Sequence, residues 1–199
     1  MNFTRGKEII ESVGREFTKD FNVNESLFLA YKSVYENLIN GLDKNAKSKG
    51  LLIIGSIGVG KTLMMKVYQK MFLGSKRAFK MIKGASLQDL LEVNSIFEIK
   101  QAYGYDLKMD LYIDDIGINN PDFKRYGNST NVIAEILMER YELFIDEGFK
   151  THLSSNLLAR LENNPNNIPT IETLYTNRVF DRIKEMCELI VIDGKSLRK

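Results

Sequence analysis

Apolar side chains recur every three or four positions through most of the first 48 residues. The pattern covers residues 7–21 and 26–42, and it predicts two amphipathic helices. A polar run at residues 43–49 then interrupts it. We therefore expect an N-terminal helical segment over residues 1–48, followed by a second unit over residues 49–199.

Beyond this break, short apolar runs alternate with stretches of helical spacing. Strands are predicted at residues 51–54, 78–82, 111–113, 151–154 and 189–192, and helices at 63–72, from Ser86 onward, and at 95–103, 131–147 and 171–186. We expect Ser129 or Thr130 to begin the long helix at 131–147 and Gly148 to end it. Strands that alternate with helices favour a parallel sheet with helices on both faces. The predicted fold class is therefore three-layer α/β.

A glycine-rich stretch connects the first predicted strand to the helix that follows it. Its sequence, Gly55-Ser56-Ile57-Gly58-Val59-Gly60-Lys61-Thr62, fits the phosphate-binding P-loop pattern G-x-x-x-x-G-K-[ST] at every defined position. In such a loop successive backbone N–H groups point at one phosphate chain, and the helix N-terminus adds partial positive charge. Lys61 would contact the β- and γ-phosphates, and the hydroxyl of Thr62 would bind Mg²⁺. The sequence therefore predicts a nucleotide site.

Two carboxylates follow the apolar strand at residues 111–113. Asp114 and Asp115 stand where parallel strands present their ligands, 53 residues after Lys61. Such a pair can simply cap a turn, but beside a P-loop Asp114 fits the Walker B acid of a magnesium shell. Asp115 would then polarise or position the attacking water. Because aspartate reaches less far than glutamate, we expect slow turnover.

Composition narrows the class of protein further. Apolar residues make up 44% of the chain and charged residues 27%, which is typical of a globular protein. No apolar run is long enough to cross a bilayer, and the N-terminus lacks an apolar signal core. The single cysteine, Cys187, excludes an internal disulfide, so a soluble protein of the cytoplasm is expected. We expect Cys187 and the single histidine, His152, to be packing residues.

The net charge of +2 conceals an uneven distribution along the chain. Residues 44–88 contain ten basic side chains and no acid, whereas residues 89–147 contain thirteen acids and five bases. The basic stretch suits phosphate ligands or a nucleic-acid backbone, although lysines also solvate ordinary surfaces. Tyr103, Tyr105 and Tyr126, with basic residues nearby, could stack on bases of single-stranded DNA. Charge alone leaves DNA binding open.

The order and spacing of four motifs resemble those of a known family. They are the P-loop, Ile113-Asp114-Asp115-Ile116-Gly117, Ser154-Ser155-Asn156-Leu157 and Asn177-Arg178-Val179-Phe180-Asp181-Arg182-Ile183. Over residues 48–193 the sequence resembles the AAA+ ATPases of the helicase-loader type, DnaC and DnaI, and the related transposition helper IstB. Only seven residues follow the last predicted strand, so we expect an AAA+ core without a full C-terminal lid.

The resemblance implies ATP and Mg²⁺ as ligands and assigns roles to three further residues. Asn156, on a strand next to that of Asp114, matches the sensor-1 residue that touches the γ-phosphate or its water. Arg182 matches the arginine finger that reaches the nucleotide of a neighbouring subunit, with Arg178 as its companion. A finger supplied in trans implies a homo-oligomer. Taken alone, the two arginines also fit an ordinary helix surface, paired with Asp181 and Glu185.

The resemblance therefore implies an ATP-binding and ATP-hydrolysing accessory protein of DNA replication. It implies a helicase loader that acts as an oligomer, with a replicative helicase as partner, possible contact with single-stranded DNA, and hydrolysis that depends on assembly or DNA. Two alternatives stay open: a transposition helper of the IstB type, and a nucleotide-gated regulator with negligible turnover. The N-terminal segment has no cysteines, so it does not match the zinc-bearing domain of some loaders.

Overall fold

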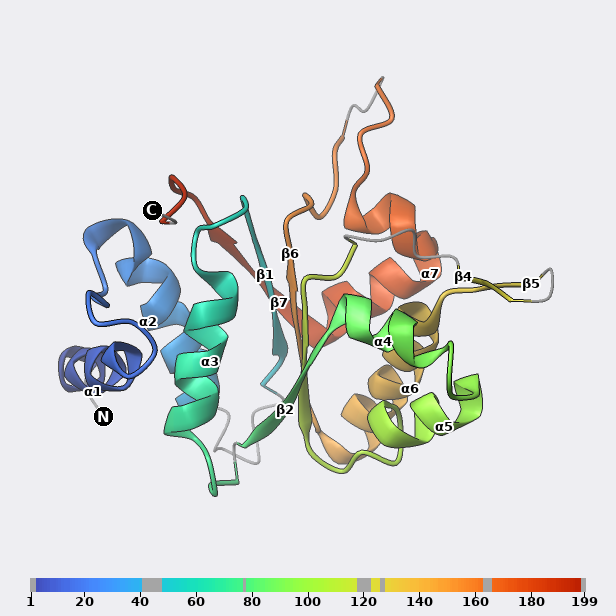
Figure 1. Cartoon of the computed structure of the whole chain (residues 1–199), viewed down its shortest axis with the longest axis horizontal. Helices are drawn as coiled ribbons and strands as arrows, with labels where there is room; N and C mark the ends of the chain where they lie inside the picture. Colours follow the sequence, from blue (N-terminus) through green and yellow to red (C-terminus); the bar gives the residue numbers. More distant parts are fainter. Residues whose placement is uncertain are drawn as a thin grey trace.

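The computed structural model describes residues 3–40, 48–76, 78–117, 123–125, 128–162 and 166–197. Its centre is a five-stranded sheet in the order β2-β3-β6-β1-β7, with parallel pairing throughout (Figure 1). The strands are β1 (Gly50–Gly55), β2 (Phe79–Lys83), β3 (Asp110–Asp114), β6 (Thr151–Ser155) and β7 (Cys187–Ile192). The helices are α1 (Phe3–Arg15), α2 (Glu25–Asn40), α3 (Lys61–Met71), α4 (Gly84–Leu90), α5 (Ile96–Tyr103), α6 (Val132–Glu147) and α7 (Ile171–Met186). The predicted three-layer α/β fold is confirmed.

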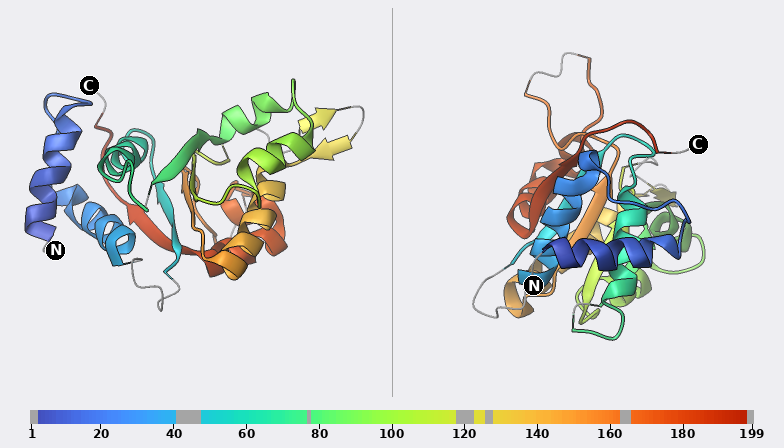
Figure 2. Two further views of the ribbon diagram at one scale, coloured as in Figure 1. Left: turned by 90° about the horizontal axis from the view of Figure 1, so that it is seen from below. Right: turned by 90° about the vertical axis from the view of Figure 1, so that its left-hand side faces the viewer.

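The two faces of the sheet carry separate cores. Helices α1–α3 lie on one side and α4–α7 on the other (Figures 1 and 2). Because side chains alternate along a strand, β1 serves both cores: Leu52 and Ile54 pack with the α4–α7 side, Leu51 and Ile53 with the α1–α3 side. A strand buried on both faces must be apolar throughout, which explains the unbroken apolar run.

The N-terminal helices share their core with the P-loop helix α3. The hydroxyl of Tyr68 on α3 donates a hydrogen bond of 2.6 Å to the carbonyl oxygen of Tyr31 on α2, and both rings are buried. Helix α1 was predicted to end at residue 21, but it ends at Arg15. Phe21 folds back onto Gly14, where a Cβ would lie 2.1 Å from its ring. The division of the chain at residue 48 stays a prediction.

Two predicted helix starts are wrong by a few residues. Helix α4 begins at Gly84, so Ser86 lies inside it. The side chain of Asn131, not Ser129 or Thr130, caps α6 by accepting the N–H of Ala134 at 3.0 Å. Residues 128–130 instead form β5 (Asn128–Thr130), which pairs antiparallel with β4 (Phe123–Arg125). These three-residue strands carry too little apolar pattern to be predicted. Gly148 ends α6 with φ 77°, as expected.

A buried arginine ties together the starts of β3 and β6. Arg140 of α6 donates to the carbonyl oxygens of Leu107 (2.8 Å), Met109 (2.9 Å) and Lys150 (2.9 Å) and to the hydroxyl of Thr151 (3.0 Å). Burial lowers the pKa of Arg140 to about 10, so the guanidinium keeps its charge at neutral pH. No helix among the described residues is long and apolar enough to span a bilayer.

His152 of β6 packs against Phe79 in the core, as predicted for a packing residue, and neither ring nitrogen has a hydrogen-bond partner in the described structure. Burial, followed by the positive charges of Lys150 and Arg140, lowers the pKa of His152 from 6.5 to about 3. Between these two values the unfolded chain binds a proton that the folded chain does not. The contribution of His152 to the free energy of unfolding is therefore fully present above the pKa of the unfolded chain, and it is lost as the pH falls from there toward the pKa of the folded chain.

We expect His152→Leu to flatten this acid dependence. On going from neutral pH to about pH 5 the wild type should lose about 2 kcal/mol of unfolding free energy through His152, and the variant should not. Urea unfolding midpoints at the two pH values, followed by far-UV circular dichroism, measure the difference. An equal loss in both proteins would contradict the assignment, whatever the variant's absolute stability.

Candidate nucleotide-binding site

The predicted P-loop connects β1 to α3 and has the backbone that the motif requires. Gly58 has φ 86° and Gly60 φ 98°, values that favour glycine, and Gly60 directly precedes the first residue of α3. Between them Val59 is buried and anchors the loop to the core, whereas Ile57 at the tip is 62% exposed. Local sequence therefore fixes the curl of the loop.

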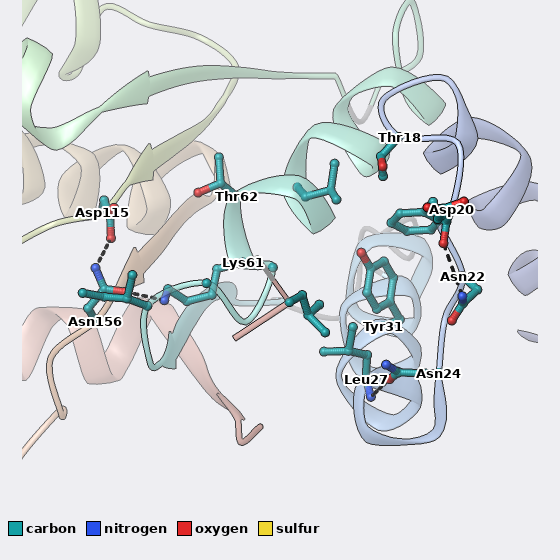
Figure 3. Close-up of a pocket in the computed structure, with 16 residues that line it drawn as sticks. Thr18, Asp20, Asn22, Asn24, Leu27, Tyr31, Lys61, Thr62, Asp115 and Asn156 are labelled. Carbon is teal, nitrogen blue, oxygen red and sulfur yellow. Dashed lines mark hydrogen bonds between the residues drawn. The ribbon is translucent and has the colours of Figure 1, made fainter. Parts of the chain in front are cut away.

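Lys61, Asn156 and Asp115 form a hydrogen-bonded row at the carboxyl ends of the strands (Figure 3). The buried ammonium of Lys61 donates to the carbonyl oxygen of Gly55 (2.7 Å), to that of Ser56 (3.1 Å) and to Oδ1 of Asn156 (2.6 Å). Nδ2 of Asn156 in turn donates to Oδ1 of Asp115 at 2.7 Å. Three residues that sequence reasoning singled out separately thus lie in one cluster.

Asn156 reaches this position because β6 lies between β1 and β3. The strand next to that of Asp114 therefore ends beside both the P-loop and the acid pair, as the resemblance implied. Asp115 follows β3 with φ 60°, an unusual conformation for a residue other than glycine, and its N–H donates to Oγ of Ser154 at 2.9 Å. This turn directs its carboxylate toward Asn156.

Thr62 and Asp114 supply the oxygen atoms predicted for a magnesium ion. Thr62 Oγ1 lies 2.9 Å from Oδ2 and 3.0 Å from Oδ1 of Asp114. Hydroxyl and carboxylate oxygens are the ligands that Mg²⁺ prefers, and it usually takes few protein ligands and completes its shell with phosphates and water. In the described part of the chain no three histidine, cysteine or carboxylate side chains gather to hold a metal. The donor set present fits magnesium held with a nucleotide.

Sequence reasoning missed two residues that bind the same carboxylate. The hydroxyls of Tyr112 and Ser154 lie 2.5 Å and 2.8 Å from Oδ1 of Asp114, and both residues are fully buried. The only signal in the sequence is the spacing of two between Tyr112 and Asp114, which places them on one face of β3.

A pocket of about 610 Å³ opens beside the P-loop (Figure 3). One side is lined by P-loop residues with Asp115 and Asn156, as the motifs predict. The other side comes from the connection between α1 and α2 and from α2 itself, residues that carried no motif. This second wall consists of Thr18, Asp20, Phe21, Asn22, Asn24, Leu27 and Tyr31.

The segment after β7 also contacts the P-loop. The N–H of Leu197 donates to the carbonyl oxygen of Gly58 at 2.9 Å, and Oγ of Ser56 donates to that of Gly194 at 3.4 Å. A Cβ at Gly58 would lie 2.2 Å from Oγ of Ser196. Residues 193–197 therefore lie against the phosphate-binding loop, a contact between distant parts of the chain that no local pattern indicates.

The two predicted finger arginines lie on α7, outside the described lining of the pocket. Arg182 stacks over the ring of Tyr141 at 4.7 Å and approaches Glu142 at 3.7 Å, so its ion-pair partner is neither Asp181 nor Glu185. Arg178 is exposed. Just before it Thr176 interrupts the helix with φ 64° and ψ 154°. The roles of both arginines stay predictions.

Two of the three tyrosines suggested for base stacking have a lysine ammonium group over the ring. Lys80 lies 4.0 Å from the ring centroid of Tyr103, and Lys108 lies 3.9 Å from that of Tyr105. Tyr126 lies outside the described residues. Contact with single-stranded DNA stays a prediction.

The parallel sheet, the P-loop after β1 and the acid pair at the end of β3 define an α/β fold of the P-loop type. Among solved structures the chain is similar to DnaI, with 20% identity, a TM-score of 0.61 and coverage of 96% of this chain and 93% of that one. It is also similar to the DnaC helicase loader, with 20% identity, a TM-score of 0.56 and coverage of 85% and 91%.

A third similar structure is AMPPCP-bound DnaA from Aquifex aeolicus, with 19% identity, a TM-score of 0.57 and coverage of 87% of this chain and 49% of that one. The sequence matches no protein-family model and no curated protein. At these identities the likeness shows a shared fold. The expected resemblance to helicase-loader AAA+ domains is confirmed at that level.

Gly58 and Gly74 allow a matched test of the contact between the P-loop and residues 193–197. Both have positive φ, 86° and 75°, but a Cβ at Gly74 meets nothing within 4 Å. Each alanine should cost about 1 kcal/mol in backbone strain, whereas only Gly58→Ala also collides with Ser196. We expect Gly58→Ala to be less stable than Gly74→Ala in thermal unfolding and to bind nucleotide more weakly.

Ser196→Gly removes the colliding atom, so added to Gly58→Ala it should restore part of both losses. Equal stability and nucleotide affinity of the two alanine variants would contradict the contact.

Proposed function

We propose that this protein binds ATP with Mg²⁺ and hydrolyses the ATP slowly, as an AAA+ accessory protein of DNA replication. The observation that carries the proposal is the row Lys61–Asn156–Asp115 beside the P-loop, with Thr62 and Asp114 next to it. These side chains come from three neighbouring strand ends and bring together a phosphate-binding cation, a sensor amide and a water-positioning carboxylate.

The chemistry follows from this placement. The N–H groups of the P-loop and of the start of α3 hold the phosphates, and the ammonium of Lys61 neutralises charge on the β- and γ-oxygens. Thr62 and Asp114 would hold magnesium, which would supply positive charge to the phosphate oxygens. Asp115 orients a water in line with the γ-phosphate, and Asn156 holds Asp115 on that side.

The rest of the nucleotide fits the pocket beyond the P-loop. Apolar side chains of Phe21, Leu27 and Tyr31 offer a surface for a base, and the nearby amides of Asn22 and Asn24 offer polar contacts for its edge. We choose adenine because DnaA, which has the same fold, binds AMPPCP, an analogue of ATP. The N-terminal helices thus become part of the nucleotide site.

We further propose that hydrolysis requires assembly of a homo-oligomer. Arg182, with Arg178 beside it, would act as an arginine finger on a neighbouring subunit's nucleotide. Helix α7 carries both arginines away from the chain's own pocket, which favours action in trans. The likeness to the DnaC helicase loader makes a replicative helicase the partner to test first, with single-stranded DNA as a second ligand.

A nucleotide-gated regulator with negligible turnover is the second candidate. It is favoured by one observation: the short carboxylate of Asp115 is engaged by Asn156 in an unusual backbone conformation. The kinetic test below separates the two candidates.

Lys61→Ala and Asp115→Asn test the two halves of the site. Lys61→Ala removes a charged donor to the phosphates and should weaken ATP–Mg²⁺ binding about 10- to 100-fold. Asp115→Asn keeps the shape and should retain binding while losing phosphate release. Fluorescent-nucleotide titration and multiple-turnover phosphate release, with and without single-stranded DNA, measure both.

Lys66→Ala is the control, because Lys66 is an exposed lysine of the same helix. Unchanged binding in Lys61→Ala would refute the nucleotide site. Tight binding with no turnover under any condition would favour the regulator.

A mixing experiment tests Arg182. Arg182→Ala should bind ATP normally and lose about 10³-fold or more in hydrolysis, the contribution of an arginine finger. If the finger acts in trans, mixing Arg182→Ala with Lys61→Ala should recover activity, because one variant supplies the arginine and the other the P-loop. Arg160→Ala, which breaks an exposed ion pair with Glu172, is the control. No recovery on mixing, with oligomers still formed, would argue against the trans role.

A further inference from the structure

Three hydroxyl groups converge on the carboxylate of Asp114. Tyr112 and Ser154 approach Oδ1 at 2.5 Å and 2.8 Å, and Thr62 approaches Oδ2 at 2.9 Å and Oδ1 at 3.0 Å. Asp114 is 4% exposed, and Tyr112 and Ser154 are not exposed at all. Oδ1 of the carboxylate is therefore held from inside the sheet, and the P-loop threonine lies within hydrogen-bond distance of both carboxylate oxygens.

The sheet builds this arrangement from two neighbouring strands. Tyr112 and Asp114 share one face of β3 because they are two residues apart. In β6, Leu153 is the register partner of Ile113, so Ser154 comes next along the strand and lies beside the end of β3. The Tyr112 ring is fixed further by an edge contact with Phe79, with centroids 6.4 Å apart.

Hydrogen counting shows that both inner groups can act as donors. Oγ of Ser154 accepts the N–H of Asp115 at 2.9 Å, which leaves its own hydrogen for Asp114. It also lies 2.8 Å from the Tyr112 hydroxyl, whose single hydrogen is shared between Ser154 and Asp114 as acceptors. The hydroxyl of Tyr112 lies 2.5 Å from Oδ1 of Asp114, and an ionised carboxylate can only accept, so the tyrosine is the donor. Hydrogen bonds to a charged acceptor are stronger than neutral ones, so the carboxylate has one preferred orientation.

Thr62 approaches the same carboxylate from the P-loop. Its Oγ1 is 2.9 Å from Oδ2 and 3.0 Å from Oδ1 of Asp114. Because Mg²⁺ takes oxygen ligands, Thr62 and Asp114 would hold the ion between them and the nucleotide. The inner donors thus keep the carboxylate beside the threonine.

We propose that Tyr112 and Ser154 are positioning residues for the divalent cation, which orient the carboxylate of Asp114 toward Thr62. The proposal rests on the proposed function, since the cation arrives with the nucleotide. On this proposal Tyr112 and Ser154 set the affinity for the metal ion, and they do not set the affinity for the nucleotide in the absence of metal. Removal of a residue that hydrogen-bonds to a metal ligand usually costs about 10- to 100-fold in metal affinity.

The test separates metal from nucleotide. Binding of a fluorescent ADP analogue is measured in EDTA and then across a Mg²⁺ titration, for wild type, Tyr112→Phe and Ser154→Ala. We expect unchanged affinity in EDTA and a Mg²⁺ half-saturation raised about 10-fold in both variants. Electron paramagnetic resonance of Mn²⁺, used in place of Mg²⁺, should show less bound ion at equal nucleotide occupancy.

Tyr105→Phe is the matched control: it removes a tyrosine hydroxyl that donates to another carboxylate, that of Asp146, outside the described lining of the pocket. Thermal unfolding of every variant identifies any loss of folding, and Ser154→Ala serves if Tyr112→Phe fails to fold. A Mg²⁺ half-saturation equal to that of the wild type would overturn the proposal. A loss of affinity for the ADP analogue that is as large in EDTA as in Mg²⁺ would also overturn it. Wild-type protein that binds no nucleotide would instead refute the proposed function.

Discussion

The candidate site depends on the parallel pairing of β6 with both β1 and β3. That pairing aligns Ile54 with Ser155 on one side and Ile113 with Leu153 on the other. The next residue of β6, Asn156, is thereby carried between the P-loop lysine and the acid pair. A slip by one residue would turn every side chain of β6 to the opposite face and separate Ser154 from Asp114. The buried Arg140, bonded to the starts of both β3 and β6, opposes such a slip.

The strands, the P-loop and the start of α5 could be predicted from the sequence, because short-range preferences determine each of them. The apolar runs gave all five strands of the sheet, and the P-loop pattern marked a loop whose glycines adopt positive φ. The capping box at Ser95 and Glu98 likewise begins α5 where predicted. In each case the preference of a few adjacent residues agrees with the final fold, which is the consistency expected of a natural sequence.

The errors and omissions arise where distant segments meet. Helix α1 stops earlier than predicted, and Phe21 packs back onto Gly14. The second wall of the pocket, the bond from Leu197 to Gly58 and the hydroxyl of Ser154 on Asp114 join residues far apart in sequence. No periodicity or motif marks such contacts, because each partner has an ordinary local role. The sequence therefore indicated the polar residues of the candidate site, but not the residues that pack against them or hydrogen-bond to them.

One consequence concerns how force could pass through the molecule. Helix α3 begins at Lys61 and, two turns later, places Tyr68 against Tyr31 of α2. A protein that binds the two N-terminal helices would therefore hold one end of α3, and the other end of α3 carries Lys61. Because packed helices resist sliding, a force on the N-terminal helices and a ligand bound at Lys61 would act on the same helix. The N-terminal helices would thus couple an applied force to the candidate nucleotide site.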